Sequence, residues 1–502
     1  MDEIRIQLEE SVRGLEPRWR HPEEVRRCAR RRRTNARVGA ALVAGAITIG
    51  VFAWALPQFG GSSPPTGPSG AIPRGELDVR FLMPAWTAEV PSATTLPGVP
   101  TDQQHVYLVD AGELLAFPKD CEGTCSPAWR APLEGGSSII RVGLVVAGDV
   151  VVASTETSLA AFASDCGSGG STCSPLWRAV LPQGATEFAG PVTVPGYVRV
   201  MYGLGGNENS RGVQASIFAL GCRSDGGVCQ PQAIVDLGSG PISVPGAGVD
   251  GVFYQRVGGT LSGIDPRLCG EDEQCRPVVD IQARDVGIET GAIYDPVVAA
   301  GELIMASADG RLSSYRPGCG AECQPQWYGE VSRFLEQPPV LAGETVVVSG
   351  GEELVAFSVG CGSAGALCEP LWHASLGGSG TIEYGDARSV VAVERDGVSN
   401  VVVFPASCSD PCEPLWSVRT PSEAQGVVVG QGHVFVGMSG GTVSAYPLEC
   451  RDPCRPAWSA DAGDGDVWDL SIDDAGVYVA VSANGSFPPG GDVRLRGFRE
   501  AT

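Results

Sequence analysis

The sequence predicts an all-β fold built from repeated four-stranded sheets, and three observations support this. Sixteen of the 17 cysteines fall into eight close pairs, which recur at a period of roughly 45 residues. In six of the eight units the second cysteine is followed by Pro-x-Trp, as in Cys125-Ser-Pro127-Ala-Trp129. The chain has 69 Gly and 38 Pro among 502 residues and only 19% charged residues, which favours short strands joined by turns. The pairs are Cys121 with Cys125, Cys166 with Cys173, Cys222 with Cys229, Cys269 with Cys275, Cys319 with Cys323, Cys361 with Cys368, Cys408 with Cys412 and Cys450 with Cys454.

Each unit carries signals for about four short strands. Val-rich runs such as residues 145–152 predict the first two strands. A Leu-x-Ala-Phe/Tyr signature four residues before most first cysteines predicts the third, at 114–117, 159–162 and 354–357, and more loosely at 312–315, 401–404 and 443–446. The Pro-x-Trp segment predicts the fourth, so the cysteine loop joins strands three and four. Four antiparallel strands per repeat, arrayed radially, form a β-propeller.

Here the chain resembles the repeat propellers that are similar to pyrroloquinoline-quinone (PQQ) enzymes, a group that includes outer-membrane assembly lipoproteins and quinoprotein dehydrogenases. Their repeats run Leu-Tyr-Ala-Leu-Asp, then a Thr-Gly turn, then a Trp on the last strand. The Thr-Gly turn is absent from this chain, and a cysteine loop stands in its place. The resemblance covers about residues 75–500 and implies a fold more than an activity. The matching tryptophans are Trp129, Trp177, Trp327, Trp372, Trp416 and Trp458, and two weaker units have Ala233 and Val279 at that place.

The number of blades depends on how the ring closes. Trp86 repeats the last-strand signature without cysteines, and residues 495–498 (Leu-Arg-Gly-Phe) repeat the third-strand signature near the C-terminus. Together these segments predict one composite blade that joins the two ends, which gives a strict count of nine. Eight blades are commoner in the resembling family, and eight is the number predicted, with nine as the alternative. Either closure removes exposed sheet edges.

The cysteine pairs are predicted to be structural disulfides, one in each blade. Each would close a short loop and stabilise the fold by roughly 2–2.5 kcal/mol in the chain-entropy estimate. Zinc binding is the alternative, but the chain has only four histidines, and a second ligand pair lies a whole blade away. The histidines are His21, His105, His373 and His433. Eight disulfides require an oxidising compartment, and the unpaired Cys28 falls in the segment predicted to be cytoplasmic.

The repeated tryptophans are predicted to dock neighbouring blades. A Trp at one fixed strand position most simply packs between sheets and donates its indole N–H to a backbone carbonyl. Stacking on a carbohydrate or quinone is the alternative for any single one.

A membrane anchor is predicted ahead of the propeller. Residues 38–56 contain no charge and are about long enough to cross a bilayer. The preceding Arg-rich run indicates a cytoplasmic N-terminus. A cleaved signal peptide, with Ala53-Trp54-Ala55 as its cleavage site, is the alternative. The predicted organisation is a basic cytoplasmic tail (1–37), a transmembrane helix (38–57), a Gly/Ser/Pro linker (58–74) and an extracytoplasmic propeller (75–502), with a basic tail similar in composition to those of actinobacterial single-span proteins.

Charge excludes one class of partner. The net charge is −23, and the region after residue 57 has 24 bases against 51 acids. Nucleic-acid binding needs clusters of Lys and Arg, so it is not expected. Asp461, Asp464, Asp466 and Asp469 form an acidic run that is assigned to a solvated turn, with calcium binding as the alternative. Residues 203–206 (Gly-Leu-Gly-Gly) lack the Lys-Ser/Thr of a phosphate loop and are assigned to a loop between strands.

No catalytic, cofactor-binding or metal-ligating residues are predicted. Quinoprotein dehydrogenases carry a disulfide between adjacent cysteines, and this chain has no Cys-Cys dipeptide and no Cys-x-x-Cys-His haem motif. The function expected is a non-catalytic binding or scaffolding platform at the cell membrane, whose partner is an envelope protein or the cell wall. One alternative is an envelope sensor that signals through an amphipathic helix carrying Ile4, Leu8, Val12 and Leu15. The other is a quinone-dependent oxidoreductase.

Overall fold

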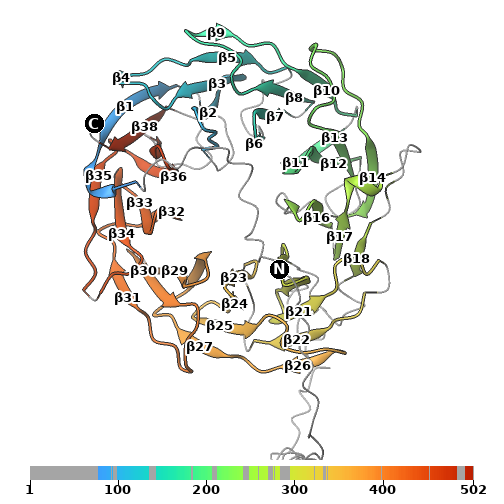
Figure 1. Cartoon of the computed structure of the whole chain (residues 1–502), viewed down its shortest axis with the longest axis vertical. Helices are drawn as coiled ribbons and strands as arrows, with labels where there is room; N and C mark the ends of the chain where they lie inside the picture. Colours follow the sequence, from blue (N-terminus) through green and yellow to red (C-terminus); the bar gives the residue numbers. More distant parts are fainter. Residues whose placement is uncertain are drawn as a thin grey trace, which may run out of the picture. The chain divides into compact units, whose positions relative to one another are not determined.

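The described part of the chain folds into nine β-sheets that follow one another around a ring (Figure 1). The computed structural model describes residues 77–502 except 92, 94–98, 135–142, 156, 183–184, 206–211, 241–247, 258, 270–274, 276, 283–293, 321–322, 332–334, 336, 397, 452, 483–491 and 501–502. The predicted tail, transmembrane helix and linker therefore lie outside the described residues. Within the described ranges, no helix has the length and hydrophobicity needed to cross a bilayer.

Eight of the nine sheets have a cysteine pair in the loop between their third and fourth strands, and they are numbered here as blades 1 to 8 in chain order. Blade 1 has β2 (His105–Asp110), β3 (Glu113–Pro118) and β5 (Trp129–Pro132); blade 2 has β6 (Gly143–Ala147), β7 (Val150–Ser154), β8 (Ser158–Ala163) and β10 (Trp177–Val180); blade 3 has β11 (Ala185–Val194), β12 (Tyr197–Leu204), β13 (Gly212–Ala219) and β14 (Ala233–Ser239); blade 4 has β15 (Gly248–Val249), β16 (Val252–Val257), β17 (Thr260–Ile264) and β18 (Val279–Gln282).

The second half of the ring repeats this order. Blade 5 has β19 (Val297–Ala299), β20 (Glu302–Ser307), β21 (Arg311–Tyr315) and β22 (Trp327–Glu330); blade 6 has β23 (Val340–Ala342), β24 (Thr345–Ser349), β25 (Glu353–Ser358) and β27 (Trp372–Ser375); blade 7 has β28 (Gly380–Gly385), β29 (Ser389–Asp396), β30 (Val398–Pro405) and β31 (Trp416–Arg419); blade 8 has β32 (Ala424–Gly430), β33 (His433–Met438), β34 (Thr442–Pro447) and β35 (Trp458–Asp461). Two short 3₁₀ helices, η1 (Val79–Phe81) and η2 (Pro266–Leu268), lie outside the sheets.

Blade 9 is the composite blade that joins the two ends of the described chain. It consists of β36 (Asp466–Asp473), β37 (Gly476–Ser482) and β38 (Val493–Glu500) from the C-terminal end and β1 (Leu82–Val90) from the N-terminal end. β1 pairs antiparallel with β38, with Trp86 opposite Gly497. The composite blade predicted from these two segments is confirmed. The predicted number of eight blades is wrong, because the composite blade adds to the eight cysteine repeats and gives nine sheets in the described residues.

Burial explains the two kinds of strand pattern in the sequence. Strands two and three of a blade lie between neighbouring blades and are buried on both faces, so β7 and β8 each show four consecutive buried residues. The fourth strand lies at the rim and alternates: Trp129 and Ala131 in β5 are buried, whereas Arg130 and Pro132 are exposed. The Val-rich runs and the Trp-x-Ala segments therefore belong to the same sheet. Its second strand is buried on both faces, and its fourth is buried on one face and exposed on the other.

The ring has two faces of different character, because consecutive strands are antiparallel. All eight cysteine loops connect strand three to strand four, so they lie on one face, called here the cysteine face. The turns between strands one and two share it; in one of them Gln431 (φ 51°) and Gly432 (φ 69°) make the left-handed turn that joins β32 to β33. The opposite face carries the turns between strands two and three and the connections between blades.

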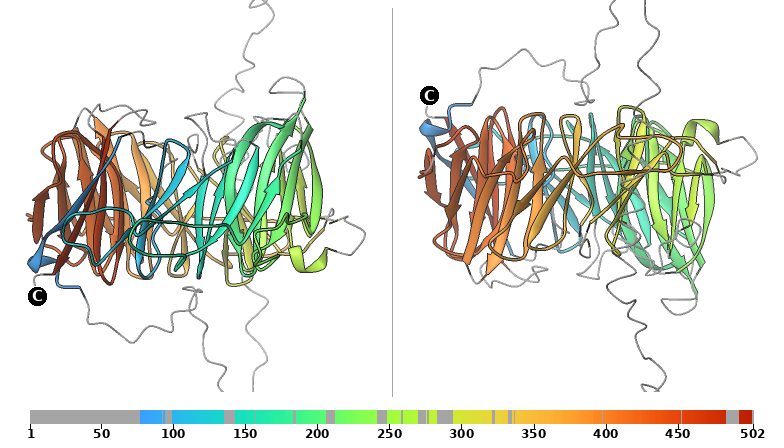
Figure 2. Two further views of the ribbon diagram at one scale, coloured as in Figure 1. Left: turned by 90° about the horizontal axis from the view of Figure 1, so that it is seen from above. Right: turned by 90° about the horizontal axis from the view of Figure 1, so that it is seen from below.

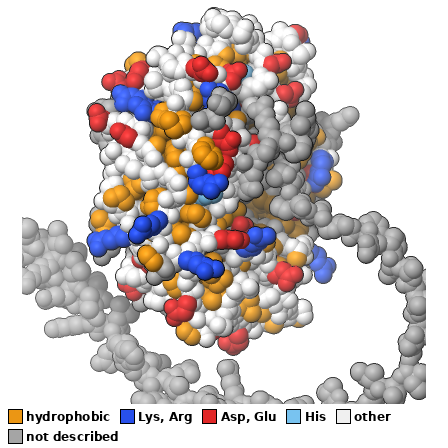
Figure 3. All heavy atoms as spheres, turned by 60° about the vertical axis from the view of Figure 1, so that its left-hand side comes forward, with side chains coloured by type: hydrophobic (Ala, Val, Ile, Leu, Met, Phe, Trp, Pro, Cys, Tyr) orange, Lys and Arg blue, Asp and Glu red, His pale blue; other side chains and the backbone are white. Residues whose placement is uncertain are grey.

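Both ends of the propeller lie on the cysteine face. Leu82 at the start of β1 is paired with Glu500 at the end of β38, and the backbone N–H of Asp78 donates to the Glu500 carboxylate. The edge-on views show the C-terminus beside the blue segment that leads into β1 (Figure 2). On the side of the ring shown in Figure 3, acidic and basic side chains are intermixed, with hydrophobic side chains between them.

Candidate functional site

The eight predicted disulfides are present, each within one blade. Each pair spans only four to seven positions of sequence, and the Cα atoms lie 4.6–6.1 Å apart, within the range that a disulfide requires. Each of the 16 cysteines in the described part of the chain therefore has the partner that the sequence predicted. The bonds join Cys121 to Cys125, Cys166 to Cys173, Cys222 to Cys229, Cys269 to Cys275, Cys319 to Cys323, Cys361 to Cys368, Cys408 to Cys412 and Cys450 to Cys454.

The two cysteines of a pair differ in exposure. The second cysteine of seven pairs is buried, at 2–9% exposure, and lies a few residues before the fourth strand of its blade. These buried cysteines are Cys125, Cys173, Cys229, Cys323, Cys368, Cys412 and Cys454, whereas Cys275 of blade 4 is only partly buried. Each disulfide thus fixes the loop to the edge of the core.

The cysteine loops do more than close their own sheets. β4 (Gly123–Thr124), β9 (Ser171–Thr172) and β26 (Ala366–Cys368) lie inside cysteine loops and pair in parallel with the last strand of the preceding blade. Elsewhere backbone hydrogen bonds outside the named strands make the same contact. The N–H of Cys229 donates to Arg178 O (2.6 Å), and the N–H of Cys412 donates to His373 O (2.7 Å), each across a boundary between blades.

Isolated parallel bridges strengthen the boundary between blades 2 and 3 and extend this arrangement to that between blades 4 and 5. They join Arg178 to Val228 and Val279 to Gly320. The crosslinked loops therefore cover the outer strand of the neighbouring blade, where an open edge would otherwise be exposed.

Seven of the nine blades carry a tryptophan that reaches the same boundary. The six predicted tryptophans and Trp86 are buried. Six of these indoles donate to a backbone carbonyl of the following blade. When that blade carries a cysteine pair, the carbonyl belongs to the residue two positions before its first cysteine. The indole N–H bonds are Trp86 to Lys119 O (3.3 Å), Trp129 to Ser164 O (3.0 Å), Trp177 to Leu220 O (2.7 Å), Trp372 to Ala406 O (3.4 Å), Trp416 to Leu448 O (3.0 Å) and Trp458 to Leu82 O (2.9 Å).

Trp327 departs from this rule. Its indole N–H donates to Glu302 Oε2 (2.9 Å) in its own blade. The same oxygen accepts from Ser314 Oγ (2.9 Å) and from the backbone N–H of Gly360 (3.2 Å) in blade 6. One carboxylate oxygen thus replaces the carbonyl and joins blades 5 and 6. No local pattern in the sequence marked Glu302 for this role.

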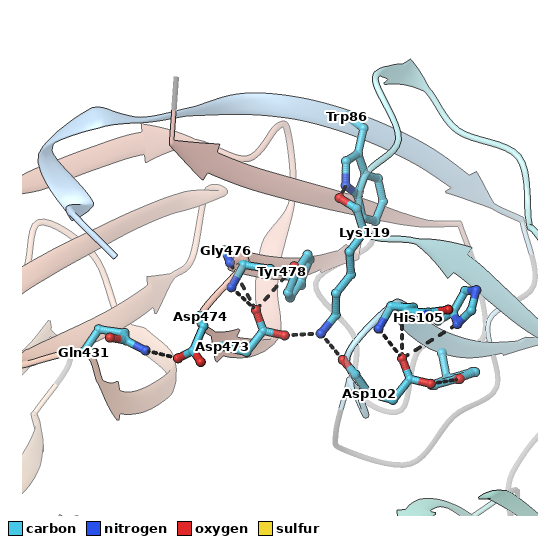
Figure 4. A network of polar contacts seen from close by, with 12 residues as sticks. Trp86, Asp102, His105, Lys119, Gln431, Asp473, Asp474, Gly476 and Tyr478 are labelled. Atoms are coloured by element: carbon cyan, nitrogen blue, oxygen red, sulfur yellow. Dashed lines mark hydrogen bonds and ion pairs between the residues drawn. The ribbon is translucent and has the colours of Figure 1, made fainter. Parts of the chain in front are cut away.

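A buried lysine links blade 9 to blade 1 (Figure 4). Lys119 is the only lysine of the chain and is 3% exposed. Its Nζ donates to the Asp473 carboxylate of blade 9 and to the backbone carbonyl of Asp102, and it lies 5.0 Å from the ring centroid of Tyr478. The Lys119 carbonyl also accepts the Trp86 indole, so side chain and backbone of one residue hold the same boundary.

Asp102 organises the blade 1 side of this cluster. Its Oδ1 accepts the backbone N–H groups of Gln104 (2.7 Å) and His105 (2.6 Å), its Oδ2 accepts the Tyr107 hydroxyl, and His105 Nδ1 lies 3.7 Å from Oδ1. Burial alone would raise the pKa of Asp102, but the hydrogen bonds from His105, Tyr107 and the backbone together lower it to about 2. Burial, and then the bond to Asp102, raise the pKa of Tyr107. An ionised Asp102 and a neutral Tyr107 therefore form a stable structural pair.

A second buried charge lies between the two blades that lack the tryptophan. Arg199 of β12 is 0% exposed, and its guanidinium carbon lies 5.4 Å from the centroid of the Phe253 ring. Its Nη1 donates to Tyr254 O (3.4 Å). Its Nε and Nη2 have no hydrogen-bond partner among the described residues. Burial lowers the pKa of Arg199 to about 10, and the attraction of Asp295 opposes this. Burial raises the pKa of Asp295 to about 6 against the opposing attraction of Arg256 and Arg199.

Two other segments considered in the sequence are the acidic run and residues 203–206. Asp461 Oδ1 accepts the N–H of Gly463 (2.7 Å), Asp466 Oδ1 accepts that of Gly440 in blade 8 (3.1 Å), and Asp469 Oδ1 accepts that of Leu470 (2.8 Å), so these three carboxylates accept from backbone amides. Among the residues that the structure describes, no three His, Cys, Asp or Glu side chains are grouped as a metal site. Gly203 and Leu204 end β12, and Gly205 follows with φ 62° in the connection to β13.

Sequence reasoning missed three polar positions, Lys119, Glu302 and Arg199. Only Lys119 carried a signal, as the single lysine in an Arg-rich composition. The partners of Lys119 and Arg199 come from other blades, so no local spacing could have identified them.

Comparison with known proteins gives no family. No protein-family model matches the chain, and no curated protein matches it. Solved structures that match include the computationally designed Ika8 protein (12% identity, 82% of this chain and 98% of that chain, TM-score 0.47), BamB from Moraxella catarrhalis (15%, 81% and 85%, TM-score 0.32) and a europium-containing methanol dehydrogenase (12%, 84% and 94%, TM-score 0.46). At these identities and TM-scores no activity or partner is transferred to this chain. The propeller fold rests on its own strand pairing, and kinship with the PQQ-like propellers stays a prediction.

Proposed function

We propose that this chain is a membrane-anchored, extracytoplasmic β-propeller that serves as a non-catalytic binding platform, with the face opposite the cysteine loops as its binding face. The choice of this face as the binding face rests on one observation. Both ends of the propeller and all eight cysteine loops are on the cysteine face. An anchor ahead of residue 77 would therefore attach on that side, and the connections between blades would point away from it.

Two features support the role of a platform. The disulfides and the indole hydrogen bonds tie each blade to itself and to its neighbour, which gives a rigid support for the loops of the opposite face. Binding residues in proteins are often carried on loops that a rigid scaffold positions. Eight local disulfides also support an oxidising, extracytoplasmic location.

Site-specific photo-crosslinking tests the choice of face with a matched pair in one blade. Glu423, in the connection into β32, is exposed on the opposite face, and Glu449, next to Cys450, is exposed on the cysteine face. A photoreactive residue is placed at each position of the full-length chain in its native cells. We expect reproducible crosslinked partners from position 423 and few from 449. Partners from position 449 alone would overturn the assignment.

Thiol labelling tests the location separately. A membrane-impermeant maleimide should leave Cys28 unlabelled in intact cells and label it after permeabilisation, while the other 16 cysteines stay unreactive until they are reduced. Labelling of many cysteines in lysed but unreduced cells would place the propeller in the cytoplasm. Binding of a quinone or of calcium by the purified protein would favour the oxidoreductase alternative, and loss of function on deletion of residues 2–20 would favour the sensor alternative.

A further inference from the structure

Blade 9 differs from the other blades in how its last two strands are connected. In blades 1 to 8 a short loop with a disulfide joins strand three to strand four. In blade 9 these strands are β38 and β1, whose contacting residues lie about 400 positions apart, such as Glu89 and Arg494 with a separation of 405. Within the described ranges, it is also the blade that contains no disulfide.

Non-covalent contacts alone therefore close the ring. The pairing of β1 with β38 extends from Leu82 opposite Glu500 to Val90 opposite Val493, with an irregularity between Pro84 and Trp86. None of the eight disulfides crosslinks β1 to β38, and the Cys121–Cys125 loop meets β1 only through hydrogen bonds, in the pairing of β4 with Trp86 and Thr87.

Lys119 adds a contact that spans the junction between blades 9 and 1. Its side chain is 4% exposed and its partner Asp473 is 27% exposed, and both lie beside Tyr478 of β37. On the same side Arg499 Nη2 donates to Cys121 O (2.8 Å). A buried ammonium that loses its carboxylate is strongly unfavourable, so this pair couples closure of blade 9 to the packing of blade 1.

We propose that blade 9 is a clasp: β1 separates from β38 as a unit while blades 1 to 8 stay folded, and the Lys119–Asp473 pair sets how often this happens. Separation would uncover the buried Trp86 and Ala88 and leave the hydrogen-bonding edge of β38 free. The clasp is thus the place where the ring opens under native conditions.

Hydrogen exchange of the full-length chain, with disulfides intact, tests this proposal. Amides of β1 and β38 should exchange faster than those of β34 and β35, the equivalent strands of blade 8. Asp473→Asn should accelerate exchange in β1 and β38 by roughly a hundredfold, as expected when a buried ion pair loses one partner. Asp474→Asn is the matched control: Asp474 is the exposed neighbour in the same turn and accepts from Gln431 Nε2 (2.8 Å), so exchange should not change.

Amine labelling provides a second readout that needs no variant. Lys119 is the only side-chain amine, so the peptide that contains it reports its exposure directly. Its labelling should occur at the rate at which β1 opens. Labelling without exchange of β1, exchange of β1 and β38 no faster than that of β34 and β35, or acceleration by Asp473→Asn spread equally over all blades would each overturn the clasp.

Discussion

Replacing Glu302 by alanine should loosen the boundary between blades 5 and 6 and leave the other boundaries unchanged. Glu302 suits this test because it is a side-chain acceptor for a blade-docking tryptophan, whereas backbone carbonyls serve Trp129, Trp177 and Trp416. A carbonyl cannot be removed by substitution, but this carboxylate can.

The magnitude follows from the three donors that Glu302 Oε2 accepts. Trp327 and Ser314 are 0% exposed, so alanine would leave their donors buried without a partner, at about 1–3 kcal/mol each. The amide of Gly360 is at an exposed position and can bind water instead. We expect a loss of about 3 kcal/mol in the free energy of opening this boundary, which corresponds to roughly a hundredfold in exchange rate.

Hydrogen exchange followed by peptide mapping is the appropriate assay, because unfolding of a nine-bladed ring is not expected to be two-state. Peptides covering β22 and β26 should exchange faster in Glu302→Ala, and those of the boundary between blades 7 and 8 should not. Glu344→Ala, an exposed glutamate in the turn before β24, is the control. In a double-mutant cycle with Trp327→Phe the two effects should not add. Unchanged exchange at β22 and β26, or full additivity, would refute the role given to this carboxylate.

Three further outcomes follow from the charges and crosslinks. Asp295 has a folded pKa of about 6 against a reference of 3.8, so its contribution favours the fold at low pH and is lost as pH rises through 6. Asp295→Asn should therefore stabilise the surrounding blades by about 3 kcal/mol at pH 8 and leave them unchanged below pH 4, measured as protection of β12 and β16 against hydrogen exchange. Asp102 has a folded pKa of about 2, so its contribution to stability, about 2 kcal/mol, is present above pH 3.8 and is lost as pH falls towards 2. Asp102→Asn should therefore remove this part of the loss of stability in acid. An unaltered midpoint of acid denaturation would contradict it. Replacing Cys408 and Cys412 by serine should lower the stability of blade 7 by about 2 kcal/mol and speed hydrogen exchange at His373 of the preceding blade. Faster exchange confined to blade 7 would argue against the role of the loop in covering the neighbouring blade.

The sequence by itself determined the features whose cause is local. The eight disulfides were predictable because four to seven positions separate their cysteines, and so short a loop leaves little choice of partner. The strand order within a blade followed from Val-rich runs, the Leu-x-Ala-Phe signature and Pro-x-Trp, since neighbouring strands of a sheet are also neighbours along the chain. The pairing of Trp86 with the C-terminal strand was predictable only because both segments copy a repeated pattern.

The tertiary structure alone decided what depends on distant residues. The sequence holds eight cysteine repeats, and nine blades result because β1 and β38 complete a further sheet instead of sharing one of those eight. The pairing of Lys119 with Asp473 spans 354 positions, and the burial of Arg199 beside Phe253 depends on the packing of two blades. Hydrophobic periodicity reports which side of a strand is buried but not which neighbour buries it, so these contacts exist only once the ring has closed.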